Sequence, residues 1–201
     1  MATARFTIEG SQPLLMHNIQ LANPANSYAK ALKTLNDKKK GKNANKEAIS
    51  DEIAETEWEG GLYFDRKAGP FLPGPMFRAA MISAARAYRK GKDIERGVYT
   101  VSRVNALGYE GPRDLNGLKG ADQFWDVQMV RVGTARVPRC RPRFDEWSTE
   151  IEVTYNEELI SLDTLTEHLR NAGRMEGVGD GRKLAFGRFE ITKVNNKIVR
   201  N

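Results

Sequence analysis

A glycine-rich segment near the end of the chain carries the strongest chemical signal in the sequence. Residues 177–191 read Gly-Val-Gly-Asp-Gly-Arg-Lys-Leu-Ala-Phe-Gly-Arg-Phe-Glu-Ile, a flexible run that leads into an alternating strand pattern. Glycine has no Cβ, so its backbone can take positive φ and a ligand can approach it closely. Arg182, Lys183 and Arg188 add cationic donors to this backbone. Such a loop suits a polyanion better than an apolar small molecule.

The same segment differs from the common phosphate-binding loops. No Gly-Lys-Ser/Thr follows it, as a Walker loop requires, and it enters a strand where a dinucleotide fingerprint opens a helix. The alternative is a plain connection that needs glycine after a helix. From the glycines alone, the two interpretations have about even odds.

A second group of cations lies in residues 139–143, Arg-Cys-Arg-Pro-Arg. If this piece is extended, its three arginines project from one face. Each phosphate that such groups neutralise releases counterions and steepens the salt dependence of binding. The candidate phosphate ligands are Arg78, Arg139, Arg141, Arg143, Arg182, Lys183 and Arg188. The alternative is that some only solubilise the surface, and we expect roughly half to contact nucleic acid.

Aromatic side chains near these cations are candidates for stacking on bases. They are Phe77, Trp125, Trp147 and Phe186. Phe77 and Phe186 fit a hydrophobic core better than a binding surface. Trp147 stands beside a basic strand and is the better stacking candidate.

Cleavage of RNA is the rival chemistry. The only histidines are His17 and His168, and an imidazole can act as a general base on a 2′-hydroxyl group. A structural role is favoured for both: His168 borders an apolar stripe, and His17, which follows strand one, is ambiguous. No pair of carboxylates in the sequence has a compelling metal-ligand spacing. We therefore expect no metal, no cofactor and no catalytic residue, with His17 and Asp65 as the alternatives if the protein is an endoribonuclease.

The composition limits the classes of binding partner and the cellular compartment that we expect. The chain has 201 residues, 40% of them hydrophobic, which suits one domain with an insertion. Its net charge of +6 favours nucleic acid or an anionic surface. Cys140 is the only cysteine, which excludes an internal disulfide and fits a reducing compartment. No apolar run approaches the roughly 20 residues of a membrane span, and no signal-peptide core is present, so we expect a cytoplasmic protein.

The elements that must position these groups follow a recognisable order once insertions are set aside. Strand patterns, helical patterns and turn signals give strand, helix, two strands, helix, strand. The expected strands lie at 4–9, 98–104, 126–137 with a break at Pro138, 150–155 and 189–192, and the expected helices at 76–89 and 163–172. The order of six elements leaves out one of the three strands between the helices. This is the α+β, ferredoxin-like β-α-β-β-α-β arrangement. Its antiparallel sheet carries both helices on one face and leaves the other available for RNA or a partner.

Two stretches interrupt that order. Residues 19–69 contain two segments with helical spacing of apolar residues, separated by a lysine-rich breaker over residues 38–46. The first segment is basic and the second is acidic, so an antiparallel helical hairpin would partly neutralise both; the alternative is a solvated, mobile excursion. Residues 105–125 are rich in Gly, Asp and Asn and are expected to form a long irregular loop, a kind that is often functional.

Three features together resemble the RAMP superfamily, the RRM-like proteins of CRISPR systems. The first is the glycine-rich segment with its strand. The second is Phe-Leu-Pro-Gly-Pro-Met-Phe-Arg-Ala-Ala at residues 71–80, which resembles the entry into that family's first helix. The third is Pro-Leu-Leu-Met-His-Asn at residues 13–18, which ends the opening strand. The resemblance covers both ends and the middle of the chain, but neither residues 19–69 nor residues 105–125.

Within that superfamily, a single RRM-like domain over residues 1–201 with an insertion between strand one and helix one looks like the backbone subunit. The resemblance implies a subunit that polymerises along guide RNA, works in antiviral defence beside other effector subunits, and uses residues 19–69 as a thumb. It implies RNA-phosphate contacts at Gly179, Gly181, Arg182, Lys183, Phe77 and Arg78. It also implies two routes to cleavage. One is a histidine general base, and the other is a thumb aspartate with a divalent metal, for which Asp37, Asp51 and Asp65 lie in the corresponding region.

Two alternatives remain open. A solitary phage-encoded relative would bind single-stranded nucleic acid, RNA or DNA, outside a CRISPR complex. A purely structural oligomer would instead set the basic faces of one copy against acidic surfaces such as residues 47–59 of another.

Overall fold

The main sheet is built around the first strand of the chain. The computed structural model describes residues 1–198, apart from the side chains of Val132 and Ala135. β1 (Ala2–Gly10) lies between β9 (Ser148–Tyr155) and β10 (Phe189–Val194), antiparallel to both. The sheet order is β11-β10-β1-β9-β6-β4-β3, and β5 also pairs with β9. The further strands are β3 (Phe64–Asp65), β4 (Gly69–Leu72), β5 (Val98–Thr100), β6 (Asn105–Gly108) and β11 (Lys197–Ile198).

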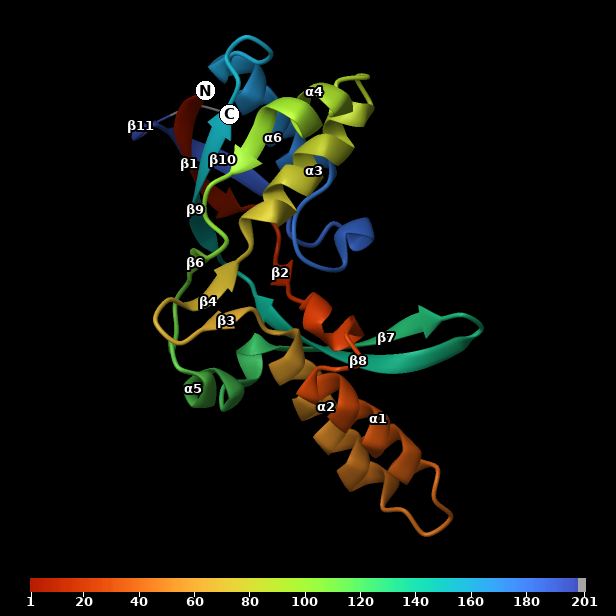
Figure 1. The fold of residues 1–201 in the computed structure, drawn as a ribbon. Helices are drawn as coiled ribbons and strands as arrows, with labels where there is room; N and C mark the ends of the chain where they lie inside the picture. Colours follow the sequence, from red (N-terminus) through yellow and green to blue (C-terminus); the bar gives the residue numbers. More distant parts are fainter. Residues whose placement is uncertain (199–201) are drawn as a thin grey trace.

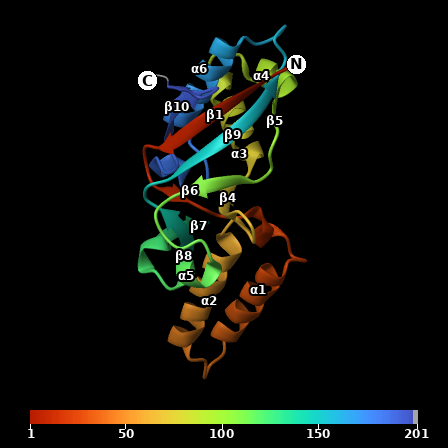
Figure 2. The ribbon, with the colours of Figure 1, turned by 90° about the vertical axis from the view of Figure 1, so that its left-hand side faces the viewer.

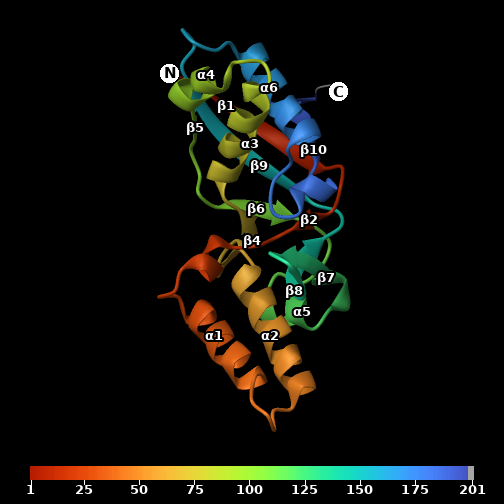
Figure 3. The same cartoon turned by 90° about the vertical axis from the view of Figure 1, so that its right-hand side faces the viewer.

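Two helices cover one face of this sheet, as Figures 1 and 3 show. They are α3 (Gly74–Arg86) and α6 (Leu162–Met175), which pack on each other and on the strands. The core therefore has the order β1, α3, β5, β9, α6, β10, which confirms the predicted ferredoxin-like α+β fold. A short helix, α4 (Gly91–Gly97), follows α3 and was not predicted.

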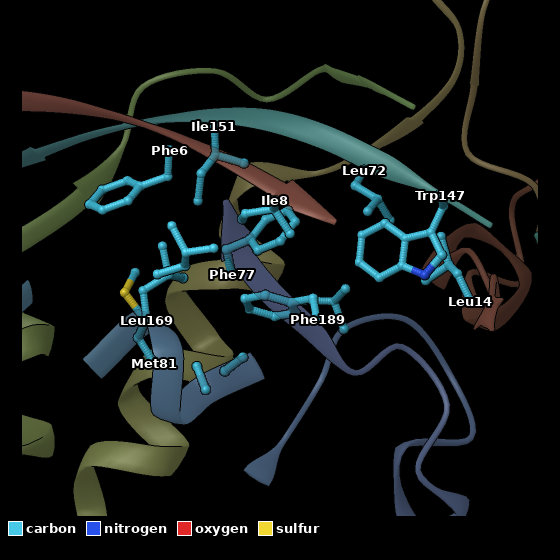
Figure 4. Close-up of a cluster of buried hydrophobic side chains, with 14 of the residues drawn as sticks. Phe6, Ile8, Leu14, Leu72, Phe77, Met81, Trp147, Ile151, Leu169 and Phe189 are labelled. Carbon is cyan, nitrogen blue, oxygen red and sulfur yellow. The ribbon is translucent and has the colours of Figure 1, made fainter. Parts of the chain in front are cut away.

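The core sits between the helices and the sheet, and it follows the residue periodicities. Phe6 and Ile8 of β1 are fully buried, as the alternation predicted, and Ile151 faces the same side from β9. Figure 4 shows these side chains meeting Phe77 of α3 and Leu169 of α6. Burying a side chain of this size contributes about 1.5–3 kcal/mol, so this layer holds the fold together.

α6 packs closely on the final strand because of one glycine. The helix begins at Ser161, whose hydroxyl oxygen accepts a hydrogen bond from the Thr164 amide. Gly173 lies inside the helix and does not end it; a Cβ there would come within 2.2 Å of the Phe189 carbonyl oxygen. The predicted helix end at residue 172 was therefore early, because Gly173 serves close helix–strand contact rather than a cap.

A helical arm projects from the sheet and the helices that cover it (Figures 1 and 2). It consists of η1 (Ile19–Ala22), α1 (Ser27–Lys39) and α2 (Lys46–Gly61), and Asn26 and Asn45 cap the two long helices. α1 and α2 pack against each other. The expected charge pairing between them is not formed: among residues 1–198 no ion pair joins α1 to α2, and Lys119 binds the α2 side chains Glu55 and Glu59.

The base of the arm is fixed by Trp58. Its ring is fully buried and stacks on Trp125 with centroids 5.1 Å apart, and its Nε1 donates to the Phe124 carbonyl oxygen at 2.8 Å. Phe124 and Trp125 belong to residues 105–125, which were expected to be one irregular loop. The structure departs from that expectation, because this stretch contains β6, α5 (Leu115–Lys119) and η2 (Asp122–Phe124).

A β-hairpin projects beside the arm. β7 (Trp125–Val132) and β8 (Ala135–Phe144) pair along their length, and β2 (Leu14–Leu15) joins the inner end of β8. The predicted single strand over residues 126–137 was wrong, because the chain reverses after Val132 and Pro138 lies inside β8. β2 pairs only with Arg143 and Phe144, so β8 has β7 alone as a neighbour at Pro138, and proline is tolerated at such an edge. No helix among the described residues has the length and apolarity needed to cross a membrane.

Candidate nucleic-acid interface

The glycine-rich loop connects α6 to β10, as predicted from its place in the sequence. Gly177, Gly179, Gly181 and Gly187 all have positive φ, between 68° and 77°. Other residues rarely adopt this conformation, so the backbone itself requires these glycines. The loop includes one short 3-10 turn, η3 (Arg182–Leu184).

The loop is held tightly against the chain around β2. The Asp180 amide donates to the Leu15 carbonyl oxygen at 2.8 Å, and the Gly187 amide donates to the Pro13 carbonyl oxygen at 2.7 Å. A Cβ on Gly179 would lie 2.4 Å from the Leu15 carbonyl oxygen. Close packing of backbone on backbone therefore accounts for Gly179 and Gly187, and phosphate contacts at Gly179 and Gly181 stay a prediction.

The cations of this loop remain available. Arg182 and Lys183 are exposed, and neither forms an ion pair within residues 1–198. Arg188 is half-buried, and its Nη2 donates to the Arg182 carbonyl oxygen at 3.4 Å. Its Nη1 is shielded from solvent and has no acceptor in the described part of the chain. These three side chains line a pocket of about 510 Å³.

The three candidate arginines, Arg139, Arg141 and Arg143, lie on the extended strand β8, as predicted, but each has a carboxylate partner. The Arg141 Nε lies 2.6 Å from Asp180 Oδ2 of the glycine-rich loop. Arg143 pairs with Asp126 and Asp145. An anion that binds these arginines must compete with the carboxylates already there.

Arg139 forms the third of these pairs, with the buried carboxylate of Glu57 on α2. The second oxygen of Glu57 accepts the Cys140 amide at 2.9 Å. Glu57 therefore joins the arm to the hairpin. Burial, with the nearby Glu57 carboxylate, raises the pKa of the Cys140 thiol to about 12, so this thiol stays protonated at neutral pH.

His17 lies where β2, the arm, β8 and the glycine-rich loop meet. Its surroundings lower its pKa, mainly through desolvation, with Arg141 and Arg139 acting in the same direction and Asp180 and Glu57 opposing them. The side chain is nevertheless exposed to solvent. Within the described residues, the His17 imidazole thus lies near two guanidinium groups, a grouping that resembles a site for proton transfer.

Of the four aromatic candidates, Phe77 and Trp147 lie in the core, whereas Trp125 and Phe186 are half-buried. Phe77 is fully buried and packs edge-on against Phe189 at 5.7 Å, so its side chain is closed to bases and phosphates. Trp147 is buried, and its Nε1 donates to the Gln12 carbonyl oxygen at 2.9 Å. The prediction that Trp147 stacks on bases therefore does not hold. Its position was readable from the sequence, because Trp147 directly precedes β9 and is in phase with the buried residues Ile151 and Val153 of that strand.

Arg78 also has a structural role in place of the predicted phosphate contact. Its Nε donates to the Val98 carbonyl oxygen at 2.7 Å and its Nη2 to the Glu95 carbonyl oxygen at 2.5 Å. The guanidinium carbon lies 5.5 Å from the ring centroid of Tyr99. Arg78 therefore ties α3 to α4 and β5.

Two of the three aspartates considered for metal-dependent cleavage, Asp65 and Asp37, are engaged by local structure. Asp65 Oδ1 accepts the Lys67 and Ala68 amides at 2.8 and 2.9 Å, and these bonds lower its pKa. Asp37 pairs with Lys40 near the far end of the arm. Among residues 1–198 no three His, Cys, Asp or Glu side chains are grouped so that they could hold a metal ion.

The open face of the sheet is not the basic surface that RNA would need. Glu150 and Glu152 project from β9 beside Thr7 and Arg5 of β1, and Arg5 is paired with Glu152 at 3.2 Å. Two cations at the glycine-rich loop, Arg182 and Lys183, form no ion pair among the described residues. Sequence reasoning missed the partners Glu57, Asp126 and Asp180, and only Asp180 had a visible signal, since it stands inside the glycine-rich motif.

The sheet order and the two covering helices define a ferredoxin-like fold, with a glycine-rich loop before the last strand. The chain is similar to a chain in the cryo-EM structure of the Type III-B Cmr-beta bound to cognate target RNA, with 9% sequence identity and a TM-score of 0.50. That similarity covers 96% of this chain and 59% of the other, so the present chain spans about 59% of its length. It is also similar to the crystal structure of Cmr6 from Pyrococcus furiosus, with 10% identity, a TM-score of 0.42, and coverage of 95% and 99%. No family model and no curated protein matches the chain.

Proposed function

We propose that this protein binds single-stranded RNA through its phosphates, without reading sequence. The observation that carries the proposal is the glycine-rich loop, where Arg182 and Lys183 are exposed and unpaired beside Arg188, whose Nη1 lacks an acceptor in the described chain. Unpaired donors around one pocket attract an anion, and phosphate contacts carry no base information. This basic surface extends along β8 through Arg139, Arg141 and Arg143, provided that phosphate displaces their carboxylate partners.

The finer role we propose is that of a backbone subunit in a CRISPR-type ribonucleoprotein effector. The RAMP-like fold supports it, and so does the likeness to a structure that is bound to target RNA. In this role copies of the protein oligomerise along guide RNA beside other effector subunits in the cytoplasm, and the arm of α1 and α2 is the thumb. A phage-encoded protein that binds single-stranded DNA or RNA alone is the alternative, and the nucleic acid that co-purifies distinguishes the two by its sugar and length.

A salt series with a matched pair of variants tests the proposal. Arg182→Gln/Lys183→Gln removes two cations from the loop. Lys92→Gln/Arg96→Gln removes the same charge from exposed positions on α4 and serves as the control. We expect the loop variant to bind every RNA sequence roughly tenfold more weakly. The slope of log affinity against log salt should fall by about 1.4, because each single-strand phosphate contact contributes about 0.7.

Two results would contradict the proposed phosphate site. If wild-type affinity does not change with salt, or if both variants lose the same affinity, the loop is not a phosphate site. Thermal melts of all three proteins separate a loss of binding from a loss of folding.

His17 supports a second candidate function, metal-independent cleavage of RNA. Its lowered pKa keeps the imidazole neutral at pH 7, and Arg139 and Arg141 lie close enough to lower that pKa. A neutral imidazole can accept the proton of a 2′-hydroxyl group, and guanidinium groups stabilise the charge that develops on the phosphate. Labelled RNA incubated with chelator tests this: specific cleavage that disappears in His17→Ala would make the protein an endoribonuclease, and intact RNA would leave it a binding protein.

A further inference from the structure

A second pocket lies across the molecule from the glycine-rich loop. It has a volume of about 630 Å³ and opens between the turn that joins β3 to β4 and the start of α5. In Figure 1 the β3–β4 turn lies on the left, whereas the connection from α6 to β10 lies on the right. The two pockets share no lining residue.

The rim of this pocket is cationic. Arg66, Lys67 and Arg113 line it, all three are exposed, and none forms an ion pair within the described residues. The nearby carboxylates are engaged by backbone amides: Asp65 closes the turn, and Asp114 Oδ1 accepts the Gly117 amide at 2.8 Å. The pocket therefore presents more positive than negative charge to an incoming ligand.

The pocket is also fixed in shape. The Arg113 guanidinium lies 4.4 Å from the ring centroid of Tyr109, and its Nη1 donates to the Leu107 carbonyl oxygen. Gly69 has φ of +71°, and a Cβ there would lie 3.2 Å from the Arg113 carbonyl oxygen, so the turn packs on the segment before α5. A cation held in place before binding loses less conformational freedom when an anion arrives.

The floor of the pocket is apolar. Phe64 and Leu115 line it, and both are half-buried. A bare anion such as phosphate would use only the rim. A nucleotide would use both, because it joins a phosphate to a planar base that stacks on aromatic rings and guanidinium groups.

We propose that this pocket binds one nucleotide unit, with its phosphate at Arg66 and Lys67 and its base against Phe64 and Arg113. The unit belongs either to a single-stranded RNA or to a free nucleotide. The first source rests on the proposed function, and it would give the protein a second contact with RNA at the base of the arm.

The test uses the full chain, an oligouridine and AMP as probes. Arg66→Gln/Lys67→Gln alters only exposed side chains of the turn, and Lys92→Gln/Arg96→Gln again controls for charge. If RNA fills the pocket, the turn variant should bind oligouridine several-fold more weakly than the control, and its salt slope should be less steep by about 1.4. Amide resonances of Ala68 and Gly69 should shift when the ligand is added to the wild-type protein.

The outcomes separate this inference from the proposed function. If the loop variant at Arg182 and Lys183 loses RNA affinity and the turn variant binds like its control, the pocket inference is overturned and RNA binding stands. If AMP shifts the turn resonances and oligouridine does not, the pocket holds a free nucleotide. If neither probe shifts them, the pocket binds no nucleotide.

Discussion

Replacing Asp180 by asparagine should make the protein bind RNA more tightly. The Asp180 carboxylate lies 2.6 Å from the Arg141 Nε, so it competes with any phosphate for this guanidinium group. It also places a negative charge beside the pocket of Arg182 and Lys183. Asp180→Asn removes that charge and keeps nearly the same shape.

The size of the gain follows from the charges involved. A phosphate bound about 6 Å from the carboxylate is repelled by about 0.7 kcal/mol in water and by about twice that at a half-screened surface. Relief of this repulsion corresponds to roughly three- to tenfold tighter binding. Because Arg141 is only 13% exposed, the free protein should also lose stability when its partner is neutralised. RNA should therefore raise the melting temperature of Asp180→Asn more than that of the wild-type protein.

Fluorescence anisotropy with labelled RNA measures the affinity, and a melt with and without RNA measures the second effect. Glu158→Gln removes the same charge from an exposed turn and is the control. If folded Asp180→Asn binds RNA no more tightly than this control, Asp180 does not compete with phosphate, and the surface between β8 and the loop is not a phosphate-binding groove.

Two predictions concern folding rather than binding. Gly187→Ala should lower the free energy of unfolding by roughly 3 kcal/mol or more, since its Cβ would lie 1.8 Å from the Val178 carbonyl oxygen. Gly133→Ala is the control: φ is also positive, but no atom lies within 4 Å, so only about 1–2 kcal/mol of backbone strain is expected in urea unfolding. Burial lowers the pKa of His168, so the unfolded chain binds its proton first as pH falls. Stability should therefore fall below about pH 6.5, by up to about 1.4 kcal/mol per pH unit; an equal pH slope in His168→Gln would contradict this.

The core of the fold was predictable because its signals are local. The alternation of Phe6 and Ile8 in β1 and the helical stripe that includes Phe77 fix which faces are buried. Pro138 was predicted to end a strand, but it lies inside β8, because a proline is tolerated where a strand has only one neighbour. The 105–125 stretch was misread because Asp114 caps a helix there and Phe124 is held by aromatic contacts with residues remote in sequence.

The site was predictable only in part, because ion pairs depend on tertiary contacts. The extended arginine row of β8 followed from its spacing, but nothing in the sequence joins Arg139 to Glu57, a residue of the inserted arm. Arg78 was expected at phosphate and is held by the Val98 and Glu95 carbonyl oxygens. Basic residues next to a family motif therefore cannot be assigned to a ligand until their neighbours in space are known.

In the glycine-rich loop, the backbone makes contacts that the fold requires, and the cationic side chains are the candidates for binding. Gly179 and Gly187 are required by contacts within the protein, because a Cβ at these positions would lie 2.4 and 1.8 Å from carbonyl oxygens, so their substitution reports on folding. Arg182 and Lys183 make no ion pair in the described chain, so their substitution reports on binding. Asp180 belongs to both groups, since its amide joins the loop to Leu15 and its carboxylate covers Arg141. Because Asp180→Asn changes only the carboxylate, it separates the two roles, and the direction of its effect on RNA affinity tells whether this loop is a connection or a phosphate site.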